Sequence, residues 1–146
     1  MAREHDDPRV AHIVRRFEAL SPADLPQLHT LYTDDAHFKD PFNEVQGVPA
    51  IQRVFEHMFV ALDGPRFVIR EAVCEGDQCF LTWDFLFRMR SLRRDEQTVR
   101  GSTHLRFAAD GRIALHRDYW DVAEELYEKL PGLGALMRWL KRRANS

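Results

Sequence analysis

Hydrophobic residues in the first part of the chain recur at helical spacing. Val10, Ile13, Val14 and Phe17 occupy positions i, i+3, i+4 and i+7 of one helical face, after a proline in the expected first turn. The same spacing returns in two later segments. The pattern predicts three helices: one over 10–20, a shorter one from Ser21-Pro22 through residue 32, and one over 51–62.

From residue 66 the spacing changes to the alternation that is typical of strands. Residues 66–74 and 79–90 flank Gly76-Asp77, and residues 97–108 and 112–120 flank Asp110-Gly111. Each pair predicts a hairpin. Helices followed by an antiparallel, aromatic sheet indicate an α+β fold. We expect a cone-shaped curved sheet that wraps around the N-terminal helices and encloses a pocket.

The second hairpin predicts which side chains face that pocket. If Ala109 pairs with Arg112, then Thr103 lies opposite Asp118 and Leu105 lies opposite His116. Facing partners share one side of a sheet. The inner face then carries Thr103, Leu105, His116, Asp118 and Trp120. The outer face carries Ser102, His104, Arg106, Leu115, Arg117 and Tyr119, which suits solvent or a subunit interface.

A second acid lies in the stretch HFKDPFN, residues 37–43. On a strand, Phe38, Asp40 and Phe42 would share one face, and Pro41 places that strand at an edge or breaks it. Asp40 and Asp118 are therefore both expected on aromatic faces. Each is either a structural carboxylate that accepts hydrogen bonds or an acid that burial adapts to proton transfer.

The stretch YTDDAHFKDPFNEVQG (32–47), followed by AIQRVFEHMF (50–59), resembles the nuclear transport factor 2-like superfamily. That superfamily includes ketosteroid isomerase, limonene epoxide hydrolase and the SnoaL-type polyketide cyclases. The resemblance covers residues 10–125 by element order. It implies one SnoaL-like domain over 1–146, with an amphipathic helical tail from about residue 122.

The resemblance assigns roles residue by residue. Asp40 falls on the general base of the isomerase, but the two oxyanion donors fall on Phe17 and Thr103, so steroid isomerisation is not expected. Asp118 falls on a catalytic acid of the epoxide hydrolase, whose Arg-x-Asp on a neighbouring strand is missing here. Asp118 and His116 fit the cyclase pattern best.

These observations predict an acid/base enzyme, of isomerase, cyclase or hydrolase type, that acts on a small, largely apolar organic molecule. Asp40 and Asp118 are the expected proton-transfer groups, and His116 is the expected tuning or relay group. The expected substrate contacts are Phe17, Tyr32, Phe42, Phe55, Trp83, Phe85, Thr103, Leu105 and Trp120. The alternative is a non-catalytic protein of the same fold that binds a small ligand or only dimerises. No cofactor is implied.

Composition limits the partners. The chain has 146 residues, 45% of them hydrophobic and 30% charged, with a net charge of −2, which gives no general attraction to nucleic acid. The histidines lack metal-ligand spacing. Two cysteines, Cys74 and Cys79, face each other beside the first turn and are expected to be reduced rather than joined. We expect a cytoplasmic homodimer that pairs around Arg106, Arg117 and Tyr119, with no nucleic-acid or membrane partner.

The tail LGALMRWLKRR, residues 133–143, is amphipathic. We expect its apolar stripe to pack on the body or on a partner subunit, while its cations favour the helix C-terminus. Binding to a membrane surface and capping of the cavity are the alternatives.

Overall fold

The computed structural model describes residues 4–90, 95–126 and 133–145. The three predicted N-terminal helices are confirmed as α1 (Pro8–Glu18), the 3-10 helix η1 (Pro22–Thr30) and α2 (Val48–Ala61). Tyr32 belongs to the following strand and not to η1. The tail contains α3 (Val122–Glu125) and α4 (Leu133–Ala144). Residues 127–132 of the tail predicted from about residue 122 lie outside the described residues, as do residues 91–94 between β4 and β5.

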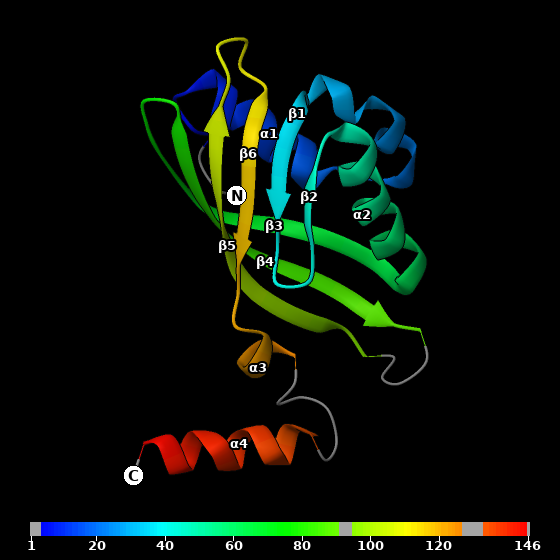
Figure 1. The fold of residues 1–146 in the computed structure, drawn as a ribbon, viewed down its shortest axis with the longest axis vertical. Coiled ribbons are helices and arrows are strands. Elements are labelled where there is room, and N and C mark those ends of the chain that lie inside the picture. The colour runs from blue at the N-terminus through cyan, green and yellow to red at the C-terminus, as the bar shows by residue number, and fades with distance from the viewer. Residues whose placement is uncertain (1–3, 91–94, 127–132, 146) are drawn as a thin grey trace.

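Six strands form one curved sheet that does not close on itself (Figure 1). They are β1 (Tyr32–Lys39), β2 (Glu44–Gln46), β3 (Leu62–Glu75), β4 (Gln78–Met89), β5 (Gln97–Phe107) and β6 (Ile113–Tyr119). Their order is β2-β1-β6-β5-β4-β3. The expectation of a wholly antiparallel sheet is wrong at one junction, because β1 runs parallel to β6. The long connection from β1 to β6, through β2, α2, β3, β4 and β5, permits this parallel pairing.

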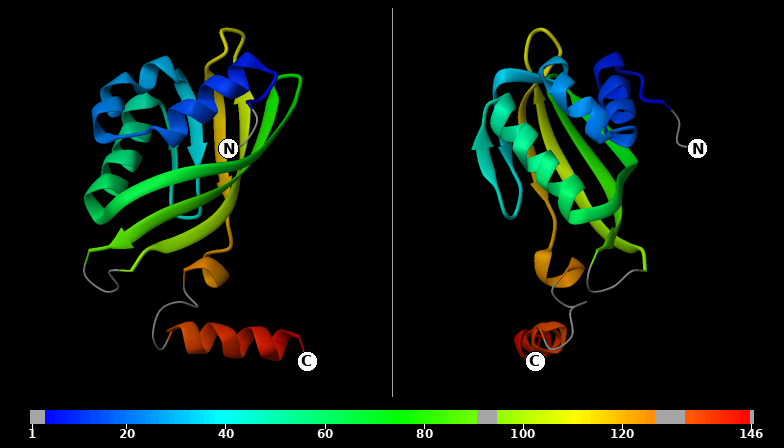
Figure 2. Two further views of the ribbon diagram at one scale, coloured as in Figure 1. Left: turned by 180° about the vertical axis from the view of Figure 1, so that it is seen from behind. Right: turned by 90° about the vertical axis from the view of Figure 1, so that its right-hand side faces the viewer.

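The helices α1, η1 and α2 lie on the concave side of the sheet, and the core fills the space between them (Figures 1 and 2). The apolar stripes of the sequence form that core. Its buried members include Val10, Ile13, Phe17, Leu28, Ile51 and Phe55 from the helices and Leu81, Leu105 and Ile113 from the strands. The α+β cone predicted from the sequence is confirmed.

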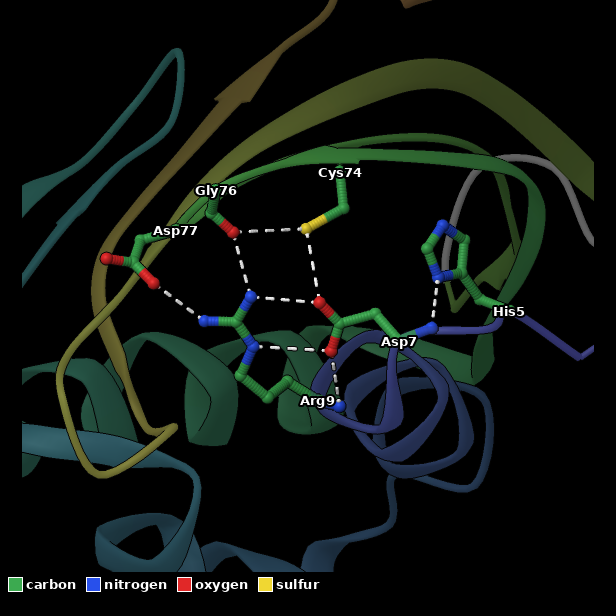
Figure 3. Close-up of polar contacts among 6 residues, drawn as sticks. All are labelled: His5, Asp7, Arg9, Cys74, Gly76 and Asp77. Carbon is green, nitrogen blue, oxygen red and sulfur yellow. Dashed lines mark hydrogen bonds and ion pairs between the residues drawn. The ribbon is translucent and has the colours of Figure 1, made fainter.

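A polar cluster fixes the start of α1 against the β3–β4 turn (Figure 3). Asp7 caps the helix by accepting a hydrogen bond from the Arg9 backbone N–H at 2.9 Å. The Arg9 guanidinium also donates to Asp77 Oδ1 at 2.7 Å and to the Gly76 carbonyl at 2.8 Å. The hydrogen bond from Arg9 holds the pKa of Asp7 well below its usual range. These contacts determine where α1 lies, and α1 carries Phe17 into the core.

Both predicted hairpins form, and the register of the second one at Thr103 and Asp118 is as predicted. Cys74 pairs with Cys79 around the Gly76-Asp77 turn, and Thr103 pairs with Asp118. Near the second turn the pairing shifts by one residue between Arg106 and Phe107, so the Ala109–Arg112 pair does not form as predicted. The β-bulge absorbs the difference and leaves the register at the site unchanged.

The two cysteines are free thiols. Burial raises the pKa of the Cys79 thiol to about 12, so at neutral pH it stays protonated and unreactive. Each helix in the described part of the chain is too short or too polar to span a membrane.

Candidate active site

Hydrogen bonds connect Trp83, Thr103 and Asp118 across three neighbouring strands. Trp83 Nε1 donates to Thr103 Oγ1 at 2.7 Å, and the Thr103 hydroxyl donates to Asp118 Oδ1 at 2.6 Å. An indole N–H can only donate, so the Thr103 oxygen is the acceptor of that first bond. The Thr103 proton is therefore directed at Asp118.

A second branch reaches the same carboxylate oxygen through His116. Its Nε2 lies 2.8 Å from Asp118 Oδ1, and its Nδ1 lies 2.8 Å from the Tyr32 hydroxyl. Burial raises the pKa of Tyr32 well above its usual range, and the negative charge of Asp118 adds to the shift. Tyr32 therefore stays protonated, and among the described residues Nδ1 is the acceptor for its hydroxyl. Nε2–H then remains to donate to Asp118.

Both donors converge on one oxygen of Asp118. Oδ2 accepts no hydrogen bond from the described residues, and the side chain is 17% exposed. The arrangement holds the carboxylate in one orientation. It leaves Oδ2 as the oxygen that can accept a proton from a bound molecule.

Asp118 lies in the wall of an apolar cavity between the helices and the sheet. The cavity holds about 20 Å³, room for roughly one water molecule. Thr103, His116 and Asp118 supply its polar corner, and the other lining residues are Phe17, Phe55, Phe67, Ile69, Leu81 and Trp83. A larger ligand enters only if one of the lining aromatic rings moves. Phe67 is the ring best placed to move, because it is half-buried while Phe17, Phe55 and Trp83 are buried.

Gly101 positions the Trp83 ring. The two residues face each other across β4 and β5. A Cβ atom on Gly101 would lie 2.4 Å from Cη2 of the indole. Only glycine lets the ring lie across β5, where Nε1 reaches Thr103. A glycine in the interior of a predicted strand is the sequence signal that could have revealed this close approach.

Asp40 has different surroundings from Asp118. β1 ends at Lys39, and the Asp40 Oδ1 accepts hydrogen bonds from the backbone N–H groups of Phe42 at 2.8 Å and Asn43 at 2.6 Å. The carboxylate therefore caps the β1–β2 turn. Phe42 is 59% exposed, so the prediction of a buried face shared by Phe38, Asp40 and Phe42 is wrong. Pro41 ends the strand before the alternation can continue.

The two acids do meet at an open groove outside the cavity. This groove, of about 460 Å³, lies at the ends of β1 and β6. Its lining residues are Lys39, Asp40, Pro41, Arg117, Asp118, Tyr119, Trp120 and Asp121. Asp118 thus borders both spaces, whereas Asp40 borders only the groove.

The other predicted site residues divide between these regions. Phe17, Phe55, Trp83, Thr103 and His116 line the cavity. Tyr32 and Leu105 are buried but do not line it, and half-buried Phe85 packs its ring on Phe67 at 4.7 Å between centroids. Phe42 and Trp120 contact each other beside the groove. Sequence reasoning missed three lining residues, Phe67, Ile69 and Leu81. Phe67 and Ile69 lie two residues apart on one strand, and Leu81 lies two residues before Trp83 on the next. This spacing puts each pair on one face of the sheet and is the signal that could have found them.

No group of three or more histidine, cysteine, aspartate or glutamate side chains in the described part of the chain could hold a metal ion. The polar groups that this site offers are thus a carboxylate, an imidazole and hydroxyls. These groups move protons and bind organic molecules.

Comparison with known proteins places this geometry in context. A family model of the SnoaL-like domain matches residues 13–116. No curated protein matches the sequence.

Several solved structures share the fold. A hypothetical protein of ketosteroid isomerase-like fold from Catenulispora acidiphila, in complex with trimethylamine, has a TM-score of 0.71 and is 17% identical, over 84% of this chain and 92% of that chain. A structure described as a SnoaL-like polyketide cyclase, from Shewanella putrefaciens, has a TM-score of 0.70 and is 18% identical, over 84% of this chain and 98% of that chain. An LEH-like epoxide hydrolase from M. tuberculosis has a TM-score of 0.65 and is 20% identical, over 88% of this chain and 91% of that chain. At this identity the likeness shows the fold alone.

Proposed function

Because the chain belongs to the SnoaL-like domain family, we propose that it is an acid/base enzyme of isomerase, cyclase or hydrolase type. Its substrate is a small, largely apolar organic molecule. Asp118 is the proton acceptor and His116 is its partner. The observation that carries the proposal is the convergence of Thr103 and His116 on a single oxygen of an acid in an apolar wall.

The chemistry follows from that geometry. Asp118 Oδ2 accepts a proton from a carbon acid of the substrate or from a water molecule beside it. The two hydrogen bonds to Oδ1 keep the carboxylate from rotating, so no reorganisation is needed when the proton moves. In an isomerase or cyclase, Asp118 returns the proton to another atom of the same substrate. In a hydrolase acting on an epoxide, the deprotonated water attacks a ring carbon, the C–O bond of that carbon breaks, and Asp118 returns the proton to the freed oxygen.

The walls set the substrate class. Phe17, Phe55 and Phe67 surround the space with aromatic rings, and the polar groups lie in one corner. A substrate with an apolar ring or chain and one polar group at its reacting end matches this distribution. Charged, extended molecules do not.

The proposal is tested with Asp118→Asn, which keeps the size and polarity of the side chain but removes the proton acceptor. Enolisable ketones, polyketide-like aromatics and small epoxides form the substrate panel. We expect the wild-type protein to turn over a member of the panel and the variant to bind that compound without turning it over. Unchanged turnover by the variant would remove Asp118 from the mechanism.

A second candidate function is binding without catalysis. Among the described residues that line the cavity there is one acid and no lysine or arginine. Aromatic rings with one carboxylate favour a small organic cation. The relative from Catenulispora acidiphila was solved with trimethylamine, which supports this candidate. Tetramethylammonium should then bind more tightly than a neutral molecule of the same shape, and equal affinities would argue against it.

We also propose that the protein is a cytoplasmic homodimer, a location that the two free thiols support. The outer sheet face carries a band of exposed side chains across adjacent strands, among them Val73, Phe80, Arg117 and Tyr119. Exposed aromatic residues beside arginine are typical of interfaces. Sedimentation should show a dimer that Tyr119→Glu dissociates. A monomeric wild-type protein at micromolar concentration would contradict this.

A further inference from the structure

Helix α4 concentrates positive charge. Residues 133–144 contain four cations, Arg138, Lys141, Arg142 and Arg143, and no acid. The whole chain carries −2, so the remainder carries −2 minus 4, or −6. A strongly basic helix is thus attached to an acidic body.

Apolar side chains of α4 are also exposed. Leu136, Trp139 and Leu140 are 49%, 48% and 45% exposed. Leu136 and Leu140 are one turn apart and share a face, and Trp139 borders it, with the Arg143 guanidinium 5.7 Å from its ring centroid. The expectation that the stripe packs on the body is therefore wrong at Leu136 and Leu140, and packing on a partner subunit stays a prediction. α4 lies beyond α3, away from the curved sheet (Figures 1 and 2).

These features together identify the kind of surface that α4 fits. Its 12 residues span about 18 Å, too short to cross a bilayer. A short helix with leucine and tryptophan on one side and arginine and lysine around them is typical of helices that lie in the membrane interface. In such helices the cations contact the phosphate groups of the lipids, and the apolar side chains insert at the boundary between headgroups and acyl chains.

We propose that α4 docks the protein on an anionic lipid surface. Leu136, Trp139 and Leu140 enter the headgroup boundary, and the four cations contact lipid phosphates. The acidic body is repelled by the same surface, so contact is confined to α4 and the rest of the protein stays in water. This replaces the expectation of no membrane partner. Nucleic acid also presents phosphate groups to the cations, but it offers no apolar layer into which Leu136, Trp139 and Leu140 could insert.

The test uses the full-length protein and sedimentation with vesicles. Vesicles of phosphatidylcholine alone are compared with vesicles that also contain phosphatidylglycerol. We expect binding to the anionic vesicles, a loss of binding as salt rises, and little binding to the neutral ones. Equal binding to both compositions, or to neither, would overturn the proposal.

Matched variants locate the contact. Arg138→Gln with Arg142→Gln should weaken binding about fivefold for each cation removed. Arg15→Gln with Arg53→Gln makes the same change in net charge at exposed positions of the body and should leave binding unchanged or only slightly weaker. Leu136→Ser with Leu140→Ser should also release the protein. Equal losses from both charge variants would mean that general charge, not α4, drives binding.

Two further measurements separate the other occupants of this face. If the serine variant changes the oligomeric state seen by sedimentation in the absence of lipid, a second copy covers α4 and the proposal fails. If a random-sequence DNA duplex displaces the protein from anionic vesicles at equal phosphate concentration, α4 is a nucleic-acid contact. Unchanged oligomeric state and no displacement support the lipid surface.

Discussion

Asp40 and Asp118 lie at the ends of neighbouring strands, each close to aromatic residues in the sequence, yet they have different surroundings. In the parallel β1–β6 pairing, Lys39 lies beside Arg117, so the two acids follow directly on adjacent strands. Asp118 continues β6 and faces the cavity with His116 and Thr103. Asp40 has left β1 and accepts hydrogen bonds from the backbone of its own turn.

The hydrogen-bond partners of each acid, and not its neighbours in the sequence, decide what that acid can do. Asp40 uses one oxygen on backbone N–H groups and both oxygens on the Asn43 side chain. Asp118 uses one oxygen on side-chain donors and keeps the other for a ligand. The first arrangement stabilises a turn, and the second suits proton transfer.

The largest effect that separates the two acids should be on turnover. Asp118→Asn should lower kcat about 10²- to 10⁴-fold, the usual contribution of a positioned acid or base. Asp40→Asn should keep the wild-type rate, because the amide oxygen still caps the turn. Steady-state kinetics on one substrate compare the two variants. Equal losses would mean that the groove, not the cavity, is the reacting site.

The packing around Asp118 can be broken without touching an acid. Gly101→Ala should push the Trp83 ring off β5 and cost about 1–3 kcal/mol of unfolding free energy, as overpacking does. Ser102→Ala, on the outer face of the same strand, is the control and should stay within about 0.5 kcal/mol of wild type. Urea unfolding measures both. A neutral Gly101→Ala would show that the indole is not held where we describe it.

The turn role of Asp40 predicts a smaller and purely structural effect. Asp40→Ala removes the acceptor of two backbone N–H groups and should cost about 1–2 kcal/mol of unfolding free energy. Asp40→Asn should cost less. Thermal unfolding of both variants, with kcat measured alongside, tests this. A stable Asp40→Ala variant with low kcat would reverse the assignment.

The smallest effect concerns alkaline pH. The raised pKa of Tyr32 means that its contribution to stability is fully present below about pH 10 and is lost as pH rises further. Above that pH, the advantage of wild type over Tyr32→Phe should shrink by up to about 1.4 kcal/mol per pH unit. Urea unfolding at pH 8 and at pH 11 measures it. A constant difference would mean that Tyr32 ionises as easily in the folded protein as in the unfolded chain.

Periodicity predicted the parts of the molecule that hydrophobic burial decides. The helices, the two hairpins and the facing pair Thr103–Asp118 follow from alternation and turn residues alone. Because the register places every second residue on one face, the hairpin pattern by itself turns His116 and Asp118 inward. Their location in the site is therefore well determined by the sequence.

The failures lie where local chemistry competes with alternation. Pro41 ends β1, so Asp40 and Phe42 leave the buried face although the pattern continues through them. The branch from Trp83 depends on its contact with Gly101 on the next strand, which alternation along either strand does not specify. The apolar stripe of α4 predicted burial, but nothing in a single sequence states which surface covers it.

The most direct test of the central claim uses the tryptophan indole N–H signals in ¹H–¹⁵N NMR. The chain has three tryptophans: Trp83 donates to Thr103 at the cavity, Trp120 lies beside the groove and the Asp40 turn, and Trp139 lies on α4. Small apolar compounds are titrated into wild-type protein. We predict that the compound that binds shifts the Trp83 signal and leaves the other two in place. A shift of Trp120 with an unchanged Trp83 would contradict the account, because it would put the ligand in the groove shared with Asp40.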